Sequence, residues 1–503
     1  MAVERETLAA ELTVAERIGR LRTLRIEGMT IDSIRIRDAS DQNGMPLIAL
    51  APTPELCCVQ FTLKPTLDSR IGVELWIPTE RWNGGFLGTG NGGRAGEINP
   101  VALIHGASMG FATANTDMGT TTDSMAMTGS FERIRDFGGR ATHLMTVFAK
   151  RIVAEFQGRE VEHSYFIGMS TGGQQALREA QEYPEDYDGI VALCPANNRV
   201  RLHASFVWNW RALTENDGPV ITSELAAAVA NRLVDKYGKL AGCAPDDTFL
   251  SYPDQVDIDW NILKDLLTDE QRTALRKVVE GAVDPVTKEQ IFGGYSLGAA
   301  LGDWYTTTAG RASLLELNFP FTWLWGAKFD PMTFDMHADY CEARERLSEL
   351  LDARDPDLST FRDRGGRLIL LTGTADDIIP FHDAIEYYEQ IVAANGGADA
   401  VDQFCRFFVV PGLGHGFGGP GAQDVGGVGF ATAPLDAEHS VLLAVKAWVE
   451  QNRAPEQILP VRFKGGVLGA EVESERPVFP YPARTRYVAG DPRRADSFER
   501  VRN

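Results

Sequence analysis

The stretch YFIGMSTGGQQALREAQEYP, from Tyr165 to Pro184, decides how the rest of the sequence is interpreted. It begins as an apolar run with the length of a buried strand and ends with the apolar spacing of an amphipathic helix. The two parts meet without a linker at a G-x-S-x-G sequence formed by Gly168, Ser170 and Gly172. Small residues flank the serine because so sharp a turn leaves no room for bulk beside its backbone. The stretch predicts a strand, a tight turn and a helix, with Ser170 as a nucleophile or, alternatively, as an ordinary turn residue.

Other short apolar runs, each bounded by Gly, Pro or Asp, lie on both sides of this unit. They cover residues 71–76, 84–89, 110–116, 163–169, 188–194, 367–373 and 404–410. Helical patterns lie between or after several of them, at residues 141–156, 174–183, 384–394 and 441–451. Alternating strands and helices are typical of a mainly parallel sheet with helices on both faces. The sequence therefore predicts an α/β fold.

The alternation stops between residues 199 and 344, where the sequence becomes helical, irregular and aromatic. We expect this segment to be an inserted lid domain, preceded by a first core part at 1–198 and followed by a second at 345–503. Aromatic rings bury a large area with few rotatable bonds, which suits a ligand site. The candidate substrate contacts are Trp208, Trp210, Trp304, Trp323 and Trp325. The alternative is that these rings form the core of the insertion itself.

The composition limits the partners and the compartment. The net charge of -21 repels nucleic-acid phosphates and anionic lipid, so we expect neither nucleic acid nor a membrane as partner. The N-terminal region has no apolar stretch of the ~7–15 residues that a signal peptide needs. The six cysteines lack the spacing of a zinc site. These features favour a cytoplasmic protein without a metal.

A nucleophilic serine needs a base and a carboxylate that orients the base, and in this fold they follow it in the order Ser, Asp or Glu, His. The run at 367–373 is followed by TADDIIPFHD, which contains Asp376 and Asp377. The run at 404–410 is followed by PGLGHGFGG, which places His415 among glycines. We therefore predict His415 as the base, while the spacing leaves both aspartates open as the orienting residue.

Two sets of backbone N–H groups are candidates for binding the oxyanion of a tetrahedral intermediate. The first is Thr171, at the start of the predicted helix, where free N–H groups and the helix dipole favour negative charge. The second is the glycine loop GFLGTGNGGRAG, through the stretch Asn91, Gly92 and Gly93.

The same loop also matches the dinucleotide-binding pattern G-x-G-x-x-G at residues 88, 90 and 93. That function requires a helix to begin at the loop and an acidic residue ~20 positions later. Here the sequence continues as RAGEINP and reaches a proline. We therefore expect no nucleotide cofactor and assign the loop to oxyanion binding.

At this point the sequence resembles the tannase and feruloyl esterase family. The similar stretches are WNGGFLGTGNGGRAGEI (82–98), GFATANTDMG (110–119), GMSTGGQQALREAQEYPEDYDGIVALCPA (168–196), GTADDIIP (373–380), PGLGHGFGGPG (411–421) and RPVFPYPARTRYVAGDPRRADSF (476–498). The resemblance implies an α/β-hydrolase core with a lid inserted between the serine and the aspartate. It places the catalytic residues on Ser170, Asp376 and His415, and one oxyanion donor on Gly92.

The sequence departs from that family in two respects. Members commonly carry a disulfide between cysteines directly before the serine and directly after the histidine, and here these positions hold Met169 and Gly416. We expect packing to hold the two loops together instead. Many members bind calcium in the lid through an Asp-Gly loop, whereas the acids at residues 246–259 lack this glycine pattern. We expect no cofactor, with lid calcium as the alternative.

The resulting hypothesis is a serine esterase that hydrolyses small aromatic esters, of phenolic or benzoic acids, through an acyl-serine intermediate. An acyltransferase would use the same triad, because an alcohol can replace water as the acceptor. A catalytically silent hydrolase fold that serves as a binding module is the alternative of a different class. The sequence does not identify the acyl group or the alcohol.

Overall fold

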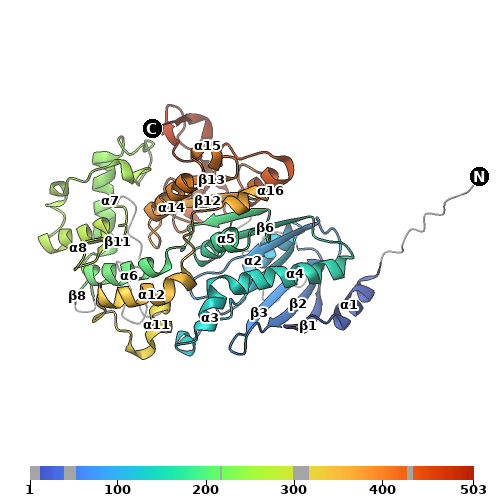
Figure 1. The fold of residues 1–503 in the computed structure, drawn as a ribbon. Helices are drawn as coiled ribbons and strands as arrows, with labels where there is room; N and C mark the ends of the chain where they lie inside the picture. The colour runs from blue at the N-terminus through green and yellow to red at the C-terminus, as the bar shows by residue number, and fades with distance from the viewer. Residues whose placement is uncertain (1–11, 39–52, 216–217, 298–316, 428–433, 503) are drawn as a thin grey trace, which may run out of the picture.

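The computed structural model describes residues 12–38, 53–215, 218–297, 317–427 and 434–502. A nine-stranded sheet runs through the centre of the molecule in the order β1-β2-β3-β5-β4-β6-β7-β12-β13 (Figure 1). Its strands are β1 (Met29–Arg37), β2 (Leu56–Leu63), β3 (Ile71–Pro78), β4 (Gly85–Thr89), β5 (Ala112–Thr116), β6 (His163–Met169), β7 (Gly189–Leu193), β12 (Arg367–Gly373) and β13 (Cys405–Val410).

The sheet is antiparallel at one side and parallel over the rest. Strands β1, β2, β3 and β5 pair antiparallel, and every neighbouring pair from β5 to β13 is parallel. The predicted mainly parallel sheet is therefore confirmed. The sequence did not predict β1 or β2, because neither is a continuous apolar run. In β1, polar and apolar residues alternate along a half-exposed edge, and in β2 the polar residues Gln60 and Thr62 interrupt the run.

Both faces of the sheet carry a hydrophobic core, because successive side chains of a strand point to opposite faces. In β12, Leu368 and Leu370 belong to one core, and Ile369 and Leu371 to the other. The first core is covered by α4 (Ala141–Gln157), α5 (Thr171–Glu182) and α14 (Phe381–Ala394). The second is covered by α16 (Val441–Gln451), and α2 (Pro100–Ser108) packs on Trp76 of the antiparallel part. This double cover explains the near-continuous apolar runs in the sequence.

Between β7 and β12 the chain leaves the sheet and forms a separate group of elements, green to yellow at one end of the molecule in Figure 1. These elements include α6 (Arg199–Leu213), α7 (Ser223–Tyr237), α8 (Asp269–Glu280), α11 (Phe319–Trp325), α12 (Ala338–Leu351), the hairpin β8 (Thr214–Glu215) and β9 (Gly218–Pro219), and the hairpin β10 (Ala282–Val283) and β11 (Gln290–Phe292). We call this segment the lid. The boundaries of the lid at residues 199 and 344 remain predictions from the sequence.

Side-chain caps mark where several helices begin. Thr222 and Thr268 accept N–H groups of the first turns of α7 and α8, and Ser440 does the same for α16. Such a cap contributes about 1 kcal/mol to helix stability. In the described part of the chain, no helix is both long and apolar enough to cross a bilayer.

The remaining elements are short and lie at the edges of the core. They are α1 (Val14–Thr23), α3 (Phe131–Arg135), α13 (Ser359–Asp363), α15 (Ala398–Val401), and two C-terminal hairpins, β14 (Val461–Phe463) with β15 (Val472–Glu475) and β16 (Arg484–Tyr487) with β17 (Phe498–Val501). The C-terminal hairpins follow α16, and their segment reaches the lid through arginine side chains.

Candidate active site

Ser170 lies at the turn between β6 and α5, in a strained backbone conformation. Its φ of 62° and ψ of -117° are unfavourable for a residue with a side chain and cost about 1–3 kcal/mol. Hydrogen bonds to the end of β7 and to the segment that follows it hold this conformation. The Ser170 N–H donates to the Leu193 carbonyl at 3.0 Å, and the Ser170 carbonyl accepts from Ala196 N–H at 3.0 Å. Strain of this kind, held by its surroundings, is typical of a functional position.

The glycines of this turn are required by close backbone contact. A Cβ at Gly90 would lie 2.4 Å from Gly172 Cα, and a Cβ at Gly168 would lie 2.2 Å from the Gly172 carbonyl oxygen. The start of α5 thus packs directly against the glycine loop that follows β4. Larger residues at these positions would separate the serine turn from that loop.

His415 and Asp376 lie on the loops that follow β13 and β12, and their side chains are hydrogen-bonded. His415 Nδ1 lies 2.8 Å from Asp376 Oδ2. The other carboxylate oxygen accepts the N–H groups of Ile378 at 2.9 Å and Ile379 at 2.8 Å, which fixes the carboxylate. Of the two aspartates that the spacing left open, this geometry favours Asp376 as the partner of His415.

The surroundings of this pair set its electrostatics. The Asp376 side chain has no exposed surface and that of His415 is 12% exposed. Burial acts to lower the pKa of His415, but the charge and hydrogen bond of Asp376 outweigh it and raise the pKa above its usual value. The buried pair therefore stabilises the imidazolium that a general base becomes.

The loops of Ser170 and His415 meet through their chain neighbours. Met169 precedes the serine and Gly416 follows the histidine, at the two positions where the resembling family carries cysteines. An ideal Cβ built on Gly416 would lie 2.3 Å from Met169 Sδ and 3.8 Å from Met169 Cβ. The thioether side chain thus lies directly against the glycine backbone. Packing brings these loops together here without a covalent link.

A buried thiol that the sequence did not predict completes this group. Cys194 directly follows β7 and has a φ of 41°. Its Sγ, a ring nitrogen of His415 and a carboxylate oxygen of Asp376 lie within 4.8 Å of one another. Burial raises the pKa of the Cys194 thiol well above its usual value, so the thiol stays protonated. Its place just after a central strand, at the same sheet edge as Asp376, was the available signal.

The two predicted oxyanion donors differ in how their surroundings hold them. Thr171 is the first residue of α5, and its hydroxyl donates to the Gly93 carbonyl at 2.7 Å. The Asn91 N–H donates to Gln175 Oε1 at 2.9 Å and is therefore engaged. Within the described residues, the N–H groups of Thr171 and Gly92 have no acceptor. Of the candidate loop residues, Asn91 is thus excluded, and Gly92, which the resemblance implies, keeps a free donor in the described structure, as does Gly93.

Arg199 is a buried cation that donates hydrogen bonds to the first turn of α5. The sequence did not predict this residue as part of the site. Its Nη2 donates to Thr171 Oγ1 at 3.0 Å and its Nε donates to Gln174 Oε1 at 2.9 Å. The guanidinium also lies over the rings of Phe137 and Phe319, at 5.7 and 5.5 Å. Burial lowers its pKa to about 9. No carboxylate in the described part of the chain forms an ion pair with it, although the charge of Asp352 acts on it, and its hydrogen bonds aim the guanidinium at the start of α5.

The glycine loop is anchored by Asn115 on β5, whose side-chain amide donates to the Thr89 carbonyl at 2.9 Å. The next helix, α2, begins at Pro100, with the proline in its first turn. The proline therefore starts a helix rather than excluding one, and that part of the argument against a nucleotide site was wrong. Residues 94–99 nevertheless separate the loop from α2, so the helix does not begin at the loop.

The structure places the described tryptophans in packing roles. Trp323 and Trp210 are buried, and Trp323 packs edge-to-face on Phe137 with ring centroids 4.9 Å apart. Trp208 and Trp325 are half-buried. Trp304 lies outside the described residues. In this conformation only Trp208 and Trp325 among the described candidates expose surface that a substrate could contact.

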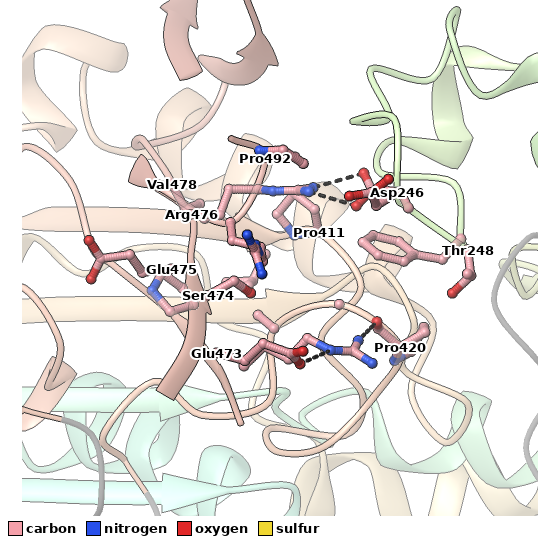
Figure 2. A pocket seen from close by; sticks show the side chains of 18 residues that line it. Asp246, Thr248, Pro411, Pro420, Glu473, Ser474, Glu475, Arg476, Val478 and Pro492 are labelled. Carbon is pink, nitrogen blue, oxygen red and sulfur yellow. Dashed lines mark hydrogen bonds and ion pairs between the residues drawn. The ribbon is translucent and has the colours of Figure 1, made fainter. Parts of the chain in front are cut away.

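Two of the acids considered for calcium, Asp247 and Asp254, are engaged by arginines of the C-terminal segment. Both oxygens of Asp247 accept from Arg476, and both oxygens of Asp254 accept from Arg484. Figure 2 shows Arg476 reaching across from the C-terminal segment toward the acidic residues of the lid. Calcium needs six to eight oxygen ligands, so these residues, as arranged, do not fit it.

The cavity beside these ion pairs, about 260 Å³ in volume, does not contain the triad. Pro411 and Pro420, which line it, belong to the loop that carries His415, but none of the three candidate catalytic residues does. It therefore lies behind the histidine loop and is a separate cavity from the candidate active site.

A mainly parallel sheet, a strained serine between strand and helix, and an Asp–His pair on later loops define an α/β hydrolase. A family model described as tannase and feruloyl esterase matches residues 57–318 and 321–501. An uncharacterized esterase of Xanthomonas campestris pv. campestris is 32% identical over 473 residues, covering 85% of this chain and 81% of that protein.

Feruloyl esterase C of Talaromyces stipitatus is 30% identical over 447 residues, covering 86% of this chain and 83% of that protein. The crystal structure of feruloyl esterase B from Aspergillus oryzae matches with a TM-score of 0.87 and 25% identity, covering 97% and 99% of the two chains. The chain belongs to the tannase and feruloyl esterase family and is a carboxylic ester hydrolase.

Proposed function

We propose that the protein hydrolyses esters of small aromatic acids through an acyl-serine, with Ser170 as nucleophile, His415 as base and Asp376 as orienting residue. One observation carries this proposal: the loops of all three residues converge at one edge of the sheet. Met169, next to Ser170, lies against Gly416, next to His415, and the His415 ring is hydrogen-bonded to Asp376.

The first chemical step is the attack of Ser170 Oγ on the ester carbonyl, with transfer of its proton to His415 Nε2. Asp376 holds the proton on Nδ1 and stabilises the imidazolium. The Thr171 and Gly92 N–H groups bind the oxyanion, and His415 then protonates the departing alcohol. Water, activated by the same histidine, hydrolyses the acyl-serine and returns Ser170 to its initial state.

Arg199 supports this step from behind Thr171. Its guanidinium donates a hydrogen bond to the Thr171 hydroxyl, and that hydroxyl donates one to the Gly93 carbonyl of the glycine loop. This chain of hydrogen bonds ties the two sides of the oxyanion site together. The buried positive charge also favours negative charge at the start of α5, because the low dielectric of the interior weakens its screening.

The aromatic acyl group is supported by the relatives, two of which are named as feruloyl esterases. It is also supported by the aromatic content of the lid, in which Trp208 and Trp325 are half-buried. A hydrolysis panel of gallate, ferulate, benzoate and short aliphatic esters tests this part. A clear preference for aliphatic esters would overturn the substrate class and leave the catalytic assignment intact.

The catalytic assignment is tested by Ser170→Ala, which removes the nucleophile and adds no bulk. We expect kcat for an aryl ester to fall by at least about 1,000-fold, with an unchanged melting temperature. A fluorophosphonate probe should label the wild-type protein once, at Ser170, and should not label the variant. Labelling elsewhere, or a variant that keeps more than a few per cent of the rate, would refute the assignment. Products formed with added alcohols distinguish hydrolysis from acyl transfer.

A further inference from the structure

A second Asp–His pair lies in the lid, outside the catalytic residues. Asp284 is in the turn between β10 and β11, and His337 directly precedes α12. His337 Nδ1 lies 2.8 Å from Asp284 Oδ2. Cys341 follows one helical turn later, so its thiol and the imidazole are on the same side of α12. A ring nitrogen, a carboxylate oxygen and the thiol sulfur all lie within 4.8 Å of one another.

We propose that Asp284, His337 and Cys341 bind a zinc ion, with water in the fourth position. Carboxylate oxygen, imidazole nitrogen and thiolate sulfur are the three kinds of protein ligand that zinc uses. Bonds of ~2.0–2.3 Å in tetrahedral geometry separate the ligand atoms by roughly 3.3–3.7 Å. Modest side-chain rotations bring the three atoms to this spacing. One carboxylate and one thiolate also neutralise the charge of the ion.

The surroundings of Asp284 resemble those of a metal ligand held in place. Its side chain is 6% exposed, and its Oδ1 accepts the N–H groups of Val286 at 2.8 Å and Thr287 at 3.1 Å. These bonds aim Oδ2 at the imidazole. Hydrogen bonds that orient a ligand in this way strengthen metal binding.

An ion can reach the cluster, and the local charge favours a cation. The His337 side chain is 35% exposed and Cys341 is half-buried. Asp335 accepts the N–H of His337 at 2.7 Å, and Asp339 in turn accepts the N–H of Asp335 at 2.8 Å. These two carboxylates add negative charge beside the three ligands, partly offset by the nearby Arg211, and attract a divalent cation.

Binding changes the protonation of two ligands. The Cys341 thiol loses its proton to solvent when the sulfur–zinc bond forms. A neutral His337 moves its proton from Nδ1 to Nε2, so that Nδ1 can bind the metal and no proton is released. One proton should therefore leave per zinc ion at a pH where the imidazole is neutral. The ion would join the β10–β11 turn to the start of α12, and this proposal does not depend on the identity of the catalytic residues.

The test uses the full-length protein, stripped of metal with a chelator and titrated with zinc against a chromophoric competitor. We expect one ion per chain, and an affinity at least ~10-fold lower in each of Asp284→Asn, His337→Ala and Cys341→Ser. Calorimetry in buffers of different ionisation enthalpy should report one released proton. The cobalt-loaded wild-type protein should show a sulfur-to-cobalt charge-transfer band, a result that requires no variant to fold.

Two matched controls are available in the same chain. His143 forms an Asp–His pair with Asp186 at 2.7 Å, and in the described residues this pair belongs to no three-ligand cluster. Cys243 is a second half-buried thiol, whose Sγ contacts the Phe249 carbonyl. His143→Ala and Cys243→Ser should leave zinc binding unchanged. Absence of binding, a cobalt complex without the sulfur band, or full affinity in both His337→Ala and Cys341→Ser would overturn the proposal.

Discussion

The molecule contains the same three residue types in two places, and their surroundings differ. The first group, which we call the catalytic cluster because it contains the proposed catalytic residues Asp376 and His415, also includes Cys194, and the lid cluster is Cys341, Asp284 and His337. The Asp–His distance is 2.8 Å in both. In the catalytic cluster the histidine side chain is 12% exposed and the carboxylate is fully buried, whereas the lid histidine is 35% exposed.

This difference in solvent exposure favours proton transfer in one cluster and metal binding in the other. In the core, burial raises the pKa of the Cys194 thiol and keeps it protonated, so the sulfur is a poor metal ligand, which is consistent with the proposed role of the Asp–His pair in proton transfer. The loop of the core histidine also lies against the loop of the strained Ser170, through Gly416 and Met169. In the lid, the half-buried Cys341 and the partly exposed His337 leave room for an ion to enter. These differences fit the two proposals, in which the same residue types serve a triad in one place and a metal site in the other.

The largest expected effect tests whether the two aspartates have different roles. Asp376→Asn should lower kcat by about 10,000-fold, because the amide cannot stabilise the imidazolium and favours the wrong tautomer of His415. The matched change Asp284→Asn should leave kcat within twofold. Steady-state kinetics on one aryl ester measures both, with melting curves as the folding control. Similar losses in the two variants would contradict the assignment of the catalytic pair.

The next effect concerns the buried cation that only the core site has. Arg199→Met should lower kcat by roughly 10- to 100-fold with little change in KM, less than the loss of a direct oxyanion donor. Arg199→Lys should restore part of kcat, because it keeps the charge. A merely structural role would instead lower the melting temperature while the kcat of the folded fraction stayed at the wild-type value.

The pH profile of kcat/KM gives a smaller effect with a definite sign. His415 must be neutral to accept the Ser170 proton, and Asp376 raises its pKa above the ordinary value of about 6.5. The acid limb of the wild-type profile should therefore lie above that value. Asp376→Asn removes the charge that raises the pKa of His415, while the burial that lowers this pKa remains. The acid limb should therefore move to lower pH. His337→Ala should not move it, and a shift in that variant would place the wrong histidine in the active site.

The junction of the serine and histidine loops offers a further test at the level of stability. The 3.8 Å between Met169 Cβ and an ideal Cβ on Gly416 matches the spacing in a disulfide. The double variant Met169→Cys/Gly416→Cys should form this bond. It should raise the free energy of unfolding by about 2 kcal/mol, since the positive φ of 76° at Gly416 offsets part of the gain. Mass spectrometry after alkylation measures the bond, and a free thiol pair would show that the loops lie farther apart.

The sequence predicted the parts of the site that local pattern determines. Ser170 directly follows an apolar run, His415 lies in the loop after another, and parallel strands bring such positions to one sheet edge. Asp376 and Asp377 are adjacent in the chain, so spacing alone left them equal; the family resemblance implied Asp376, and the hydrogen bond to His415 favours the same residue. Arg199 depends on the tertiary approach of distant segments, for which no local pattern exists, whereas Cys194 had a signal in its place just after a central strand. The tryptophans illustrate the same limit, because composition cannot distinguish a ring in the lid core from one facing a ligand.

The smallest expected effect is a difference in thiol reactivity between the cysteines of the two clusters. Of the six cysteines, only Cys243 and Cys341 are half-buried, and the other four, Cys194 among them, are buried. A disulfide-exchange thiol reagent should therefore react rapidly with two thiols in the native protein and with all six after unfolding. One equivalent of zinc should protect one of the two rapidly reacting thiols, and Cys341→Ser should abolish that protected class. Rapid reaction at Cys194, identified by peptide mapping, would show that the core cluster is as accessible as the lid cluster and would remove the distinction between them.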